Sequence, residues 1–579
     1  MFLPLTQKEA LALGWERLDV ILVTGDAYID SPYIGVAVIG KVLADAGFRV
    51  GIIAQPDVSC DCDISRFGEP ELFWGVTSGC MDSMIANYTA TKKRRKSDDL
   101  TAGGINNRRP DRAVITYTNL IRRYCRTKKP IVLGGIEASL RRISHYDYWS
   151  NRVRRSILFD AKADILVYGM GERAVVELAE HLKAKQPVTG LRGTCHIAKQ
   201  APEGWIKLPS HAEAAADKDI FTKMFNIFYA NTDPVTAKGL CQLQDTRYLI
   251  VNPPQPPLNT AELDHVHELD FERGAHPVYV DKGPIRALDT IRFSLSTHRG
   301  CYGECNFCSI TAHQGRIVTS RSEASILSEV EKIVAHPGFS GIIADAGGPT
   351  ANMYGFECAR KLKQGACAGK RCLTPEPCRH LPVSHLAQIR LLGKIAGISG
   401  VKKVFVASGI RHDLVMTDKK HGRRYLETIC KNHVSGQLKT APEHTDPFIL
   451  ELLGKPGAGA FKQFASLYET INRHSGKNQY LTCYFIAAHP GCDMSHMKAL
   501  KRFVSSVLRF TPEQVQIFTP SPLTISTLMY YTQKTEDGRP VFVEKDMHKK
   551  EAQKMVITGR RKKQKKPPVR CRRAHKIDS

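Results

Sequence analysis

The chain has 579 residues and a formal net charge of +26, from 83 lysines and arginines against 57 aspartates and glutamates. Since single hydrophobic cores stop growing at roughly 250–300 residues, we expect two or three domains. Hydrophobic residues make up 42% and charged residues 24%, which is ordinary globular usage, and no apolar run is long enough to indicate a membrane span.

The N-terminus lacks the basic start and long apolar core of a signal peptide. The 17 cysteines are spread irregularly, which favours reduced thiols and metal ligation over a disulfide framework. Both observations predict a cytoplasmic protein that does not associate with a membrane.

Residues 1–185 are predicted to form an α/β domain with a flavodoxin- or Rossmann-like doubly wound sheet. Apolar strands are expected over residues 19–26, 49–54, 72–77, 130–135 and 164–169, with a helix over residues 35–46. Apolar strands that alternate with helices are typical of a parallel sheet covered on both faces. The loops GGIE (134–137) and GMGE (169–172) should lie at the carboxyl ends of strands, where such folds bind ligands.

Residues 186–285 have a less regular pattern and are predicted to be a connector. A helix is expected over residues 218–228, and the Pro-rich segment 252–257 should end regular structure.

Residues 286–525 contain six further strand-like runs with helices between them. They are expected at residues 291–296, 341–344, 403–407, 435–438, 480–486 and 514–518. Six parallel β/α units predict a partial (β/α)6 barrel of the TIM type, whose active site belongs at the carboxyl ends of the strands. A short extension with a disordered basic tail, residues 526–579, should complete the chain.

Three cysteines follow the first of these runs with C-x3-C-x2-C spacing, namely Cys301, Cys305 and Cys308. Thiolates this close can face one point from a single loop, as the ligands of an iron–sulfur cluster do, whereas zinc sites prefer paired C-x2-C units and four ligands. The motif resembles the signature of the radical S-adenosylmethionine (SAM) superfamily. That resemblance implies a [4Fe-4S] cluster on the three cysteines, SAM on the open iron, Phe307 beside the adenine, and reductive cleavage to a 5′-deoxyadenosyl radical.

Later loops of the same region predict contacts with SAM at Gly347, Gly348, Ser408, Lys439 and Glu443. The two glycines permit close backbone approach, and the resemblance places them at the SAM amino group. Lys439 could pair with the SAM carboxylate, and Glu443 could accept from an amine or a ribose hydroxyl. For both, a surface ion pair is the alternative, and Ser408 and Arg411 are weaker candidates. No residue is assigned to chemistry on the substrate.

A second cysteine group lies in an insertion over residues 355–385, with Cys358, Cys367, Cys372 and Cys378. Four cysteines within so short a segment could bind a second metal ion or cluster. Their spacings match no standard paired motif, so unligated reduced cysteines are the alternative.

Several longer motifs define a narrower group. They are GDAYID (25–30), IAQPD (53–57), GGIEASLRR (134–142), SHYDYW (144–149) and LKTAPEH (438–444). Together they are similar to the YgiQ-type radical SAM family over about residues 19–531. The resemblance implies the cofactors and leaves the reaction and substrate unassigned.

The N-terminal pattern also resembles the cobalamin-binding domains that precede many radical SAM cores. A histidine ligand to cobalamin would need a D-x-H-x-x-G loop, and residues 30–35 read DSPYIG, with Ser31 near the position of the histidine. We therefore expect a scaffold or substrate domain without cobalamin. A cobalamin that lacks a protein ligand is the alternative.

The leading functional hypothesis is a radical SAM enzyme that abstracts hydrogen from an unknown substrate and takes its electron from a donor such as flavodoxin or ferredoxin. The basic segments 92–96 and 560–576 motivate a second hypothesis, an RNA-modifying methylthiolase or methyltransferase. Cys60, Cys62 and Cys80 do not obviously match the additional cysteines of methylthiolases. A third hypothesis is a non-catalytic scaffold that carries an iron–sulfur cluster or zinc.

Overall fold

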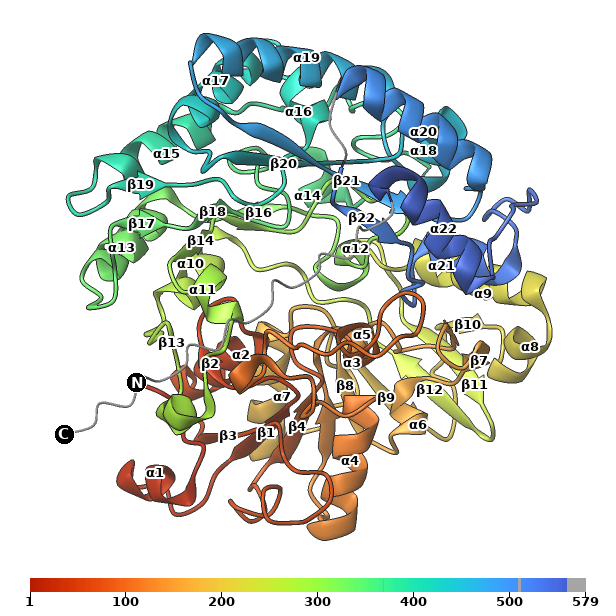
Figure 1. Ribbon diagram of the computed structural model, residues 1–579. Coiled ribbons are helices and arrows are strands. Elements are labelled where there is room, and N and C mark those ends of the chain that lie inside the picture. The colour runs from red at the N-terminus through yellow and green to blue at the C-terminus, as the bar shows by residue number, and fades with distance from the viewer. Residues whose placement is uncertain (368, 509–511, 560–579) are drawn as a thin grey trace, which may run out of the picture.

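The computed structural model describes residues 1–367, 369–508 and 512–559. The predicted disordered tail, residues 560–579, lies outside the described residues. The described chain forms two stacked halves, with residues 1–251 mostly below and residues from about 294 onward above in the view of Figure 1.

The lower half is built on a nine-stranded sheet whose parallel part has the order β3-β1-β4-β5-β8. These strands are β1 (Val20–Thr24), β3 (Val50–Ala54), β4 (Phe73–Thr77), β5 (Ile131–Leu133) and β8 (Ile165–Val167). Numbered along the chain, their order is 2-1-3-4-5, which is the flavodoxin-like arrangement. The five predicted strands and the large parallel sheet are thus confirmed.

Alternate residues of β1 face two different hydrophobic clusters, because successive side chains of a strand point to opposite faces. Ile21 and Val23 pack with helix α4 (Ala113–Tyr124), whereas Val20 and Leu22 pack with α2 (Gly35–Asp45) and α7 (Glu172–Lys183). Helices therefore cover both faces, which explains why these strands are apolar throughout.

Residues 186–285 were predicted to connect two domains, and this prediction is wrong for most of the segment. Strands β9 (Thr194–Ala198), β12 (Arg247–Val251), β11 (Leu240–Gln244) and β10 (Ile206–Leu208) extend the same sheet beyond β8. β9 runs antiparallel to β8, and β11 and β12 form an antiparallel pair whose turn places Asp245 at a φ of 55°. The predicted helix is present as α9 (Lys218–Ala230), with Asp217 as its N-cap.

The upper half contains parallel strand pairs that follow one another in chain order. β14 (Ser294–Ser296) pairs with β18 (Asp345–Gly347), β17 (Ile342–Ile343) with β19 (Lys403–Val404), and β20 (Gln437–Glu443) with β21 (Tyr480–Ala487), which pairs with β22 (Val515–Ile517). A parallel bridge from Ile410 to Thr440 joins the segment after β19 to β20. All six predicted strand positions therefore carry strands.

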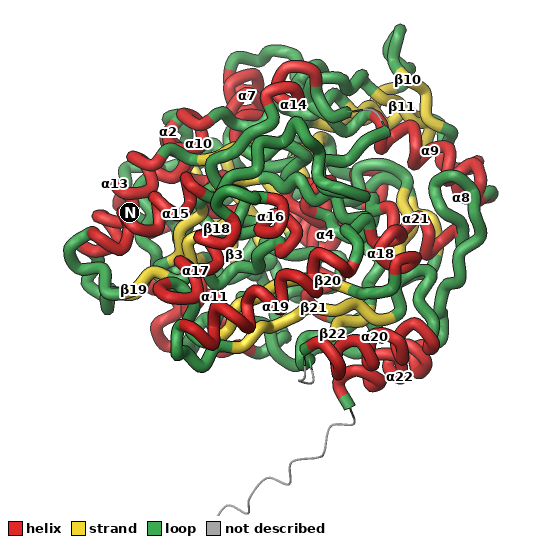
Figure 2. The backbone as a smooth tube through the Cα atoms, turned by 90° about the horizontal axis from the view of Figure 1, so that it is seen from above, coloured by secondary structure: helices red, strands yellow, loops and turns green. Residues whose placement is uncertain are grey.

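Helices lie on the outer side of these strands. They are α13 (Glu323–Val334), α15 (Leu386–Gly397), α17 (Gly422–Asn432), α19 (Ala458–His474) and α20 (Met494–Val507) (Figure 1). Seen from above, α19 runs along β20 and β21, and the loops gather toward the middle of the molecule (Figure 2).

The remaining helices and strands are short. They are α1 (Gln7–Ala12), β2 (Ile29–Asp30), α3 (Ser83–Asn87), α5 (Gly135–Ser139), β6 (His145–Asp147), β7 (Arg152–Arg154), α6 (Ile157–Asp160), α8 (His211–Ala216), α10 (Thr260–Glu268), β13 (Gly274–Ala275), α11 (Ala287–Ile291), β15 (His298–Arg299), α12 (Ile310–His313), β16 (Thr319–Ser320), α14 (Ala359–Gln364), α16 (His412–Thr417), α18 (Pro447–Leu453), α21 (Ile525–Thr532) and α22 (Met547–Thr558). None of the helices in the described part of the chain has the length and apolar character needed to cross a lipid bilayer.

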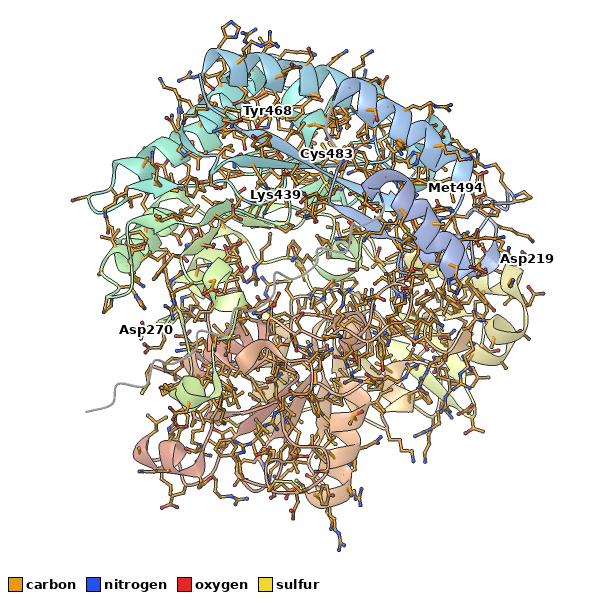
Figure 3. The ribbon with its side chains drawn as sticks, viewed as in Figure 1. Asp219, Asp270, Lys439, Tyr468, Cys483 and Met494 are labelled. Atoms are coloured by element: carbon orange, nitrogen blue, oxygen red, sulfur yellow. A yellow bond between two sulfur atoms is a disulfide. The ribbon has the colours of Figure 1, made fainter. Side chains whose placement is uncertain are left out.

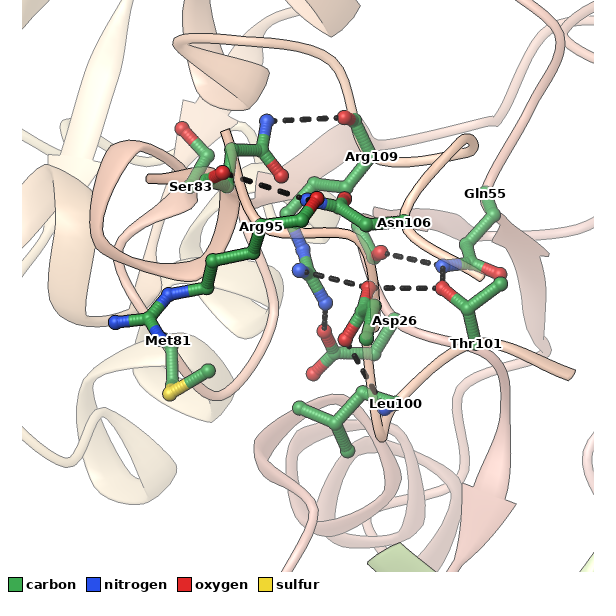
Figure 4. A network of polar contacts seen from close by, with 12 residues as sticks. Asp26, Gln55, Met81, Ser83, Arg95, Leu100, Thr101, Asn106 and Arg109 are labelled. Atoms are coloured by element: carbon green, nitrogen blue, oxygen red, sulfur yellow. Dashed lines mark hydrogen bonds and ion pairs between the residues drawn. The ribbon is translucent and has the colours of Figure 1, made fainter. Parts of the chain in front are cut away.

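A buried polar network holds the long segment after β4 against the carboxyl edge of the sheet (Figure 4). Arg109 pairs with Asp26 at 2.5 Å and with Asp98 at 2.9 Å, and its side chain is fully buried. Gln55, which follows β3, donates to the Thr101 hydroxyl at 2.7 Å. One arginine thus neutralises two carboxylates in a place that water does not reach.

Candidate active site between the two halves

A cavity of about 510 Å³ lies between the two halves and takes its walls from both. From the lower half it is lined by the loops after β4, β5 and β8, including Cys80, Gly134, Gly135 and residues 169–172. From the upper half come residues of the loops after β14, β18 and β19. The volume is that of a pocket for a small-molecule ligand or cofactor.

The glycine loops of the lower half lie where the sequence predicts, at the carboxyl ends of β5 and β8. Gly135 has a φ of +77°, and a Cβ there would lie 2.3 Å from the Thr77 hydroxyl oxygen. Only glycine fits this position, so the loop after β5 can turn closely past the end of β4.

The cysteine loop begins at β15 and leads into α12. Gly300 has a φ of +82°, and a Cβ there would lie 1.9 Å from the carbonyl oxygen of Ile317. Further along the loop, Asn306 donates from its side chain to the Leu452 carbonyl at 2.9 Å, and its backbone N–H donates to Leu453 at 2.9 Å. Close packing at one end and hydrogen bonds at the other thus fix the loop.

The thiols of Cys301, Cys305 and Cys308 converge. A Cβ on Gly303 would lie 3.2 Å from the Cys301 sulfur and 3.6 Å from the Cys305 sulfur. Burial and the neighbouring thiols of Cys305 and Cys301 raise the pKa of Cys308 to about 12. In a four-iron cluster each cysteine binds a different iron, so the three sulfurs need to surround a volume and not a single ion. The arrangement fits such a cluster.

Arg411 is the cation of this loop. Its Nη1 donates to the Cys305 sulfur at 3.7 Å, while Nη2 pairs with Asp413 at 2.6 Å. Burial lowers the pKa of Arg411, but Asp413 and the sulfurs of Cys305 and Cys301 together raise it. Sequence analysis offered Arg411 as a weak candidate for SAM; the structure places it beside the sulfurs, where a positive charge favours thiolates.

Gly347, Gly348 and Ser408 line the cavity, as expected of residues that contact one ligand. A Cβ on Gly348 would lie 2.6 Å from the His298 ring, so glycine allows the loop after β18 to pass this close. Ser408 donates its hydroxyl to Asp345, and its backbone N–H donates to the same carboxylate at 3.0 Å. These hydrogen bonds hold Asp345, two positions before Gly347, and so help to fix the glycine loop.

Phe307, Lys439 and Glu443 are not among the residues that line this cavity. Lys439 is half-buried on β20, next to the strand that carries Cys483 (Figure 3). Glu443 is 8% exposed at an irregularity of the β20–β21 pairing, with a φ of 66°. A non-glycine residue in this conformation is uncommon and is often found at functional sites.

The electrostatic environment of Glu443 connects it to the cysteine loop. Burial raises the pKa of Glu443, and the positive charges of Lys455 and Arg411 oppose this effect. The carboxylate of Glu443 in turn contributes to the raised pKa of Cys308. The ion pair with Lys455 is long, 3.9 Å, so the carboxylate retains capacity to accept hydrogen bonds.

Three histidines of the cavity wall were not predicted from the sequence. His267 and His298 are buried and His313 is partly buried, and each has at least one ring nitrogen without a hydrogen-bond partner among the described residues. Burial lowers the pKa of His298 and of His313 to about 4, so both imidazoles are neutral near pH 7. For His298 and His313, closeness to the cysteine motif was a sequence signal, whereas His267 lies 34 positions before Cys301 and had none. They offer hydrogen bonds to a polar ligand.

Among the described residues no three Cys, His, Asp or Glu side chains are already gathered closely enough to hold a single metal ion, and this is true of the second cysteine group and of the cysteine loop alike. Cys358 and Cys372 instead belong to a small apolar cluster with Tyr302 and Leu373. The Lys361 ammonium donates to the Cys372 sulfur at 3.3 Å. The insertion thus packs against the cysteine loop as part of its support.

Comparison with known proteins identifies the family. The sequence profile described as "Radical SAM N-terminal" matches residues 2–294. A UPF0313 protein of Fusobacterium nucleatum is 54% identical over 97% of this chain and 100% of its own length. A UPF0313 protein of Thermotoga maritima is 46% identical over 97% and 99%. The chain belongs to the UPF0313 family. This is the YgiQ-type radical SAM family expected from the motifs, and these matches identify an enzyme whose substrate is unassigned.

Two solved structures resemble this UPF0313 protein in fold. The radical SAM methyltransferase TsrM from Kitasatospora setae, solved with cobalamin and a [4Fe-4S] cluster, has a TM-score of 0.50 at 14% identity and covers 87% of this chain and 74% of its own. OxsB, a cobalamin-dependent SAM radical enzyme solved with aqua-cobalamin, has a TM-score of 0.49 at 12% identity, over 92% and 58%. The scaffold hypothesis loses its basis, because the chain is a radical SAM enzyme.

The expectation that cobalamin is absent is wrong as it was argued. It rested on the missing histidine of the DSPYIG segment, yet the fold is shared with an enzyme that was solved with cobalamin. A missing lower ligand argues only against histidine-ligated cobalamin. It says nothing about the space above the sheet, where the structure has its large cavity.

Proposed function

We propose that this UPF0313 protein binds a [4Fe-4S] cluster through Cys301, Cys305 and Cys308 and cleaves SAM reductively. The observation that carries the proposal is that the Cys301 and Cys305 thiols flank Gly303 beside the Arg411 guanidinium, with the Cys308 thiol near enough to both for their charges to raise its pKa. When bound and reduced, the cluster supplies the electron that cleaves the SAM sulfonium to a 5′-deoxyadenosyl radical. The electron comes from a donor that we propose to be flavodoxin or ferredoxin.

The residues around the cluster loop would orient SAM. Gly347 and Gly348 leave their backbone open to the SAM amino group, and Asp345 holds that loop through Ser408. Glu443 accepts from an amine or ribose hydroxyl, and we assign the SAM carboxylate to Lys439. Phe307, partly buried against the main core, would contact the adenine.

We also infer that the six strand positions form the partial (β/α)6 barrel of a radical SAM core. The parallel pairs in chain order and the outer position of the helices support this inference (Figure 1). The cysteine loop and the Gly347–Gly348 loop then lie at the carboxyl ends of its first two strands, which is where barrels of this type place their chemistry.

The test is anaerobic reconstitution followed by reduction with dithionite. Wild type should hold about four irons per chain and release 5′-deoxyadenosine from SAM. Cys301→Ala should do neither, whereas Cys125→Ala, which changes a partly buried cysteine on the lower half, should behave as wild type. A wild type without 5′-deoxyadenosine, or a Cys301→Ala variant equal to wild type, contradicts the proposal.

Cobalamin is a candidate second cofactor. The cavity lies above the carboxyl ends of a sheet with flavodoxin-like order, and its glycine loops and neutral histidines suit a large polar ligand. Incubation with hydroxocobalamin followed by gel filtration should leave the corrin absorbance on the protein. A protein that elutes without this absorbance, under conditions in which SAM is cleaved, would refute the candidate.

RNA modification is the second candidate function, and one contact favours it. Lys93 of the basic segment 92–96 pairs with Glu551 of α22 at 2.6 Å. Helix α22 ends at Thr558, two positions before the basic segment 560–576 in the sequence, so the ion pair joins segment 92–96 to the helix that precedes the second basic segment. Comparing RNA modifications between a deletion strain and its parent tests this function. An unchanged set of modifications argues against it.

A further inference from the structure

A side pocket of about 110 Å³ opens beside the large cavity. The two share part of their walls, namely residues 169–172, Arg299, His313 and Gln314. The side pocket is thus a branch of the large cavity, separate from the wall formed by Gly347 and Gly348.

Four arginines line the side pocket, against a single carboxylate. The arginines are Arg142, Arg173, Arg299 and Arg316, and the carboxylate is Glu172. Glu172 is already paired with Arg299, and Arg173 is paired with Glu262 at 2.5 Å. Among the described residues, no carboxylate pairs with Arg142 or Arg316. Among the residues that line it, the pocket therefore has an excess of two positive charges; outside this lining, Glu536 lies near enough to Arg316 for the arginine's charge to oppose the rise in the pKa of Glu536 that burial causes.

Arg142 is the most exceptional of these side chains. It is 3% exposed, and its Nε has no hydrogen-bond partner among the described residues. Its guanidinium lies over the rings of Tyr168 and Phe228, at 4.6 and 4.8 Å, and donates to the Ser139 carbonyl. Aromatic rings and one carbonyl offset only part of the several kcal/mol that a buried, unpaired charge costs. An anion in the pocket would supply the missing partner.

Arg316, from the upper half, has surroundings like those of Arg142. Its guanidinium lies 4.3 Å from the centre of the Tyr229 ring, and its buried Nε also lacks a partner among the described residues. The residue follows the cysteine loop by a few positions. Two guanidinium groups from the two halves of the chain thus face one small space.

The N-terminus of α7 adds an independent contribution. Gly171 is its N-cap, with no side-chain cap, and Gly171, Glu172, Arg173 and Ala174 all line the pocket. The free N–H groups of a first helical turn, together with the helix dipole, attract anions. α7 has 12 residues, enough for a developed dipole.

We propose that this side pocket binds a carboxylate or phosphate group of the substrate, while the rest of the substrate extends into the large cavity. The small volume admits the anionic group and not a whole nucleotide. The assignment of the ligand as substrate rests on the proposed function; the anion site itself rests only on Arg142, Arg316 and the start of α7.

Anion binding is measured on reconstituted full-length protein without SAM or reductant. Titration with inorganic phosphate and with acetate, at constant ionic strength set with choline chloride, should give saturable binding of at least one of them by calorimetry. Arg142→Gln should weaken that binding at least tenfold. Arg122 lies on α4, is exposed and pairs with Asp164, so Arg122→Gln should leave anion binding unchanged.

Arg316→Gln guards against a folding defect in Arg142→Gln, because Arg316 is only partly buried. It should also weaken anion binding, with a circular dichroism spectrum like that of wild type. The proposal is overturned if neither anion binds wild type, or if both glutamine variants bind as wild type does.

The source of the anion is tested in cell extract separated on an anion-exchange column. The fraction that yields a SAM-dependent product should be a retained one, and inorganic phosphate should inhibit its turnover by wild type. An active fraction that passes through the column overturns the assignment to substrate. If SAM is not cleaved at all but Arg142→Gln loses phosphate binding, the anion site stands and the proposed function falls.

Discussion

Replacing Gly300 by alanine tests how the cysteine loop is positioned. Gly300 directly precedes Cys301 and has a φ of +82°. An alanine Cβ there would lie 1.9 Å from the Ile317 carbonyl oxygen, an atom of the backbone that cannot rotate away. The matched control is Gly315→Ala, just after helix α12, into which the cysteine loop leads. Gly315 has a φ of +92°, with nothing within 4 Å of an added Cβ.

The structure separates two costs of the substitution. Both alanines are forced into the left-handed region, at about 1–2 kcal/mol each. In Gly300→Ala the contact must also lengthen from 1.9 Å to about 3.4 Å, where ordinary contact begins. Overpacking of this kind costs a further ~1–3 kcal/mol. It also displaces Cys301 by more than the ~0.5 Å that a preorganised site tolerates.

The assay is the iron and sulfide content after anaerobic reconstitution, with urea unfolding of each variant as a measure of stability. Gly315→Ala should hold as much iron as wild type and lose about 1–2 kcal/mol of unfolding free energy. Gly300→Ala should lose most of its iron and unfold at lower urea. If the two variants hold equal iron and unfold alike, the close contact with Ile317 does not position Cys301.

Three further predictions follow from buried charges. Arg109→Met leaves the Asp26 and Asp98 carboxylates unpaired and should lower the unfolding free energy by about 3–5 kcal/mol in urea titrations. The control Arg473→Ala removes an exposed ion pair on a helix and should change the unfolding free energy by about 0.5 kcal/mol or less. Similar losses in the two variants would contradict the stabilising role of the buried network. Burial lowers the pKa of Lys550 from its ordinary value of 10.5 to about 8. Between pH 8 and pH 10.5 the unfolded chain therefore binds more protons at Lys550 than the folded protein does. The unfolding free energy should consequently rise with pH over this range, by up to about 3 kcal/mol. Lys550→Met should lack this rise, and parallel pH profiles would refute the assignment. Glu443→Gln should weaken SAM binding roughly 10- to 150-fold in equilibrium dialysis, since a hydrogen bond to a charged group contributes about 1.5–3 kcal/mol, and an unchanged affinity would remove Glu443 from the SAM site.

Sequence patterns predicted the parallel strands well, because both faces of those strands are buried and their apolar runs are uninterrupted. Residues 186–285 were misread since β9 to β12 extend the sheet mostly through antiparallel pairs, with β10 parallel to β11 at the edge, and contain mixed polar and apolar residues. β9 joins the sheet by pairing with β8, a contact between strands that the pattern within residues 186–285 does not reveal.

At the site, local spacing was informative and composition was not. The three cysteines of the C-x3-C-x2-C motif lie within one loop, so their spacing in the sequence is enough to predict that their thiols lie near one another. Cys358 and Cys372 were candidates for metal by number alone, and the structure places them in an apolar cluster. Arg142 and Arg316 meet only through tertiary contact, 174 positions apart in the printed chain. No local signal could have paired them.

The buried ion pair between Arg299 and Glu172 ties the cysteine loop to the start of α7, at the wall shared by both cavities. The two side chains are only 15% and 4% exposed, so separating these loops breaks their ion pair and returns both charges to water. Each 1.4 kcal/mol that the opening costs makes the open form about tenfold rarer. A large molecule enclosed there would stay through many reaction cycles, whereas one that enters past the side pocket could exchange in every cycle. We therefore expect pulse–chase exchange of labelled ligands to show slower release from the large cavity than from the side pocket.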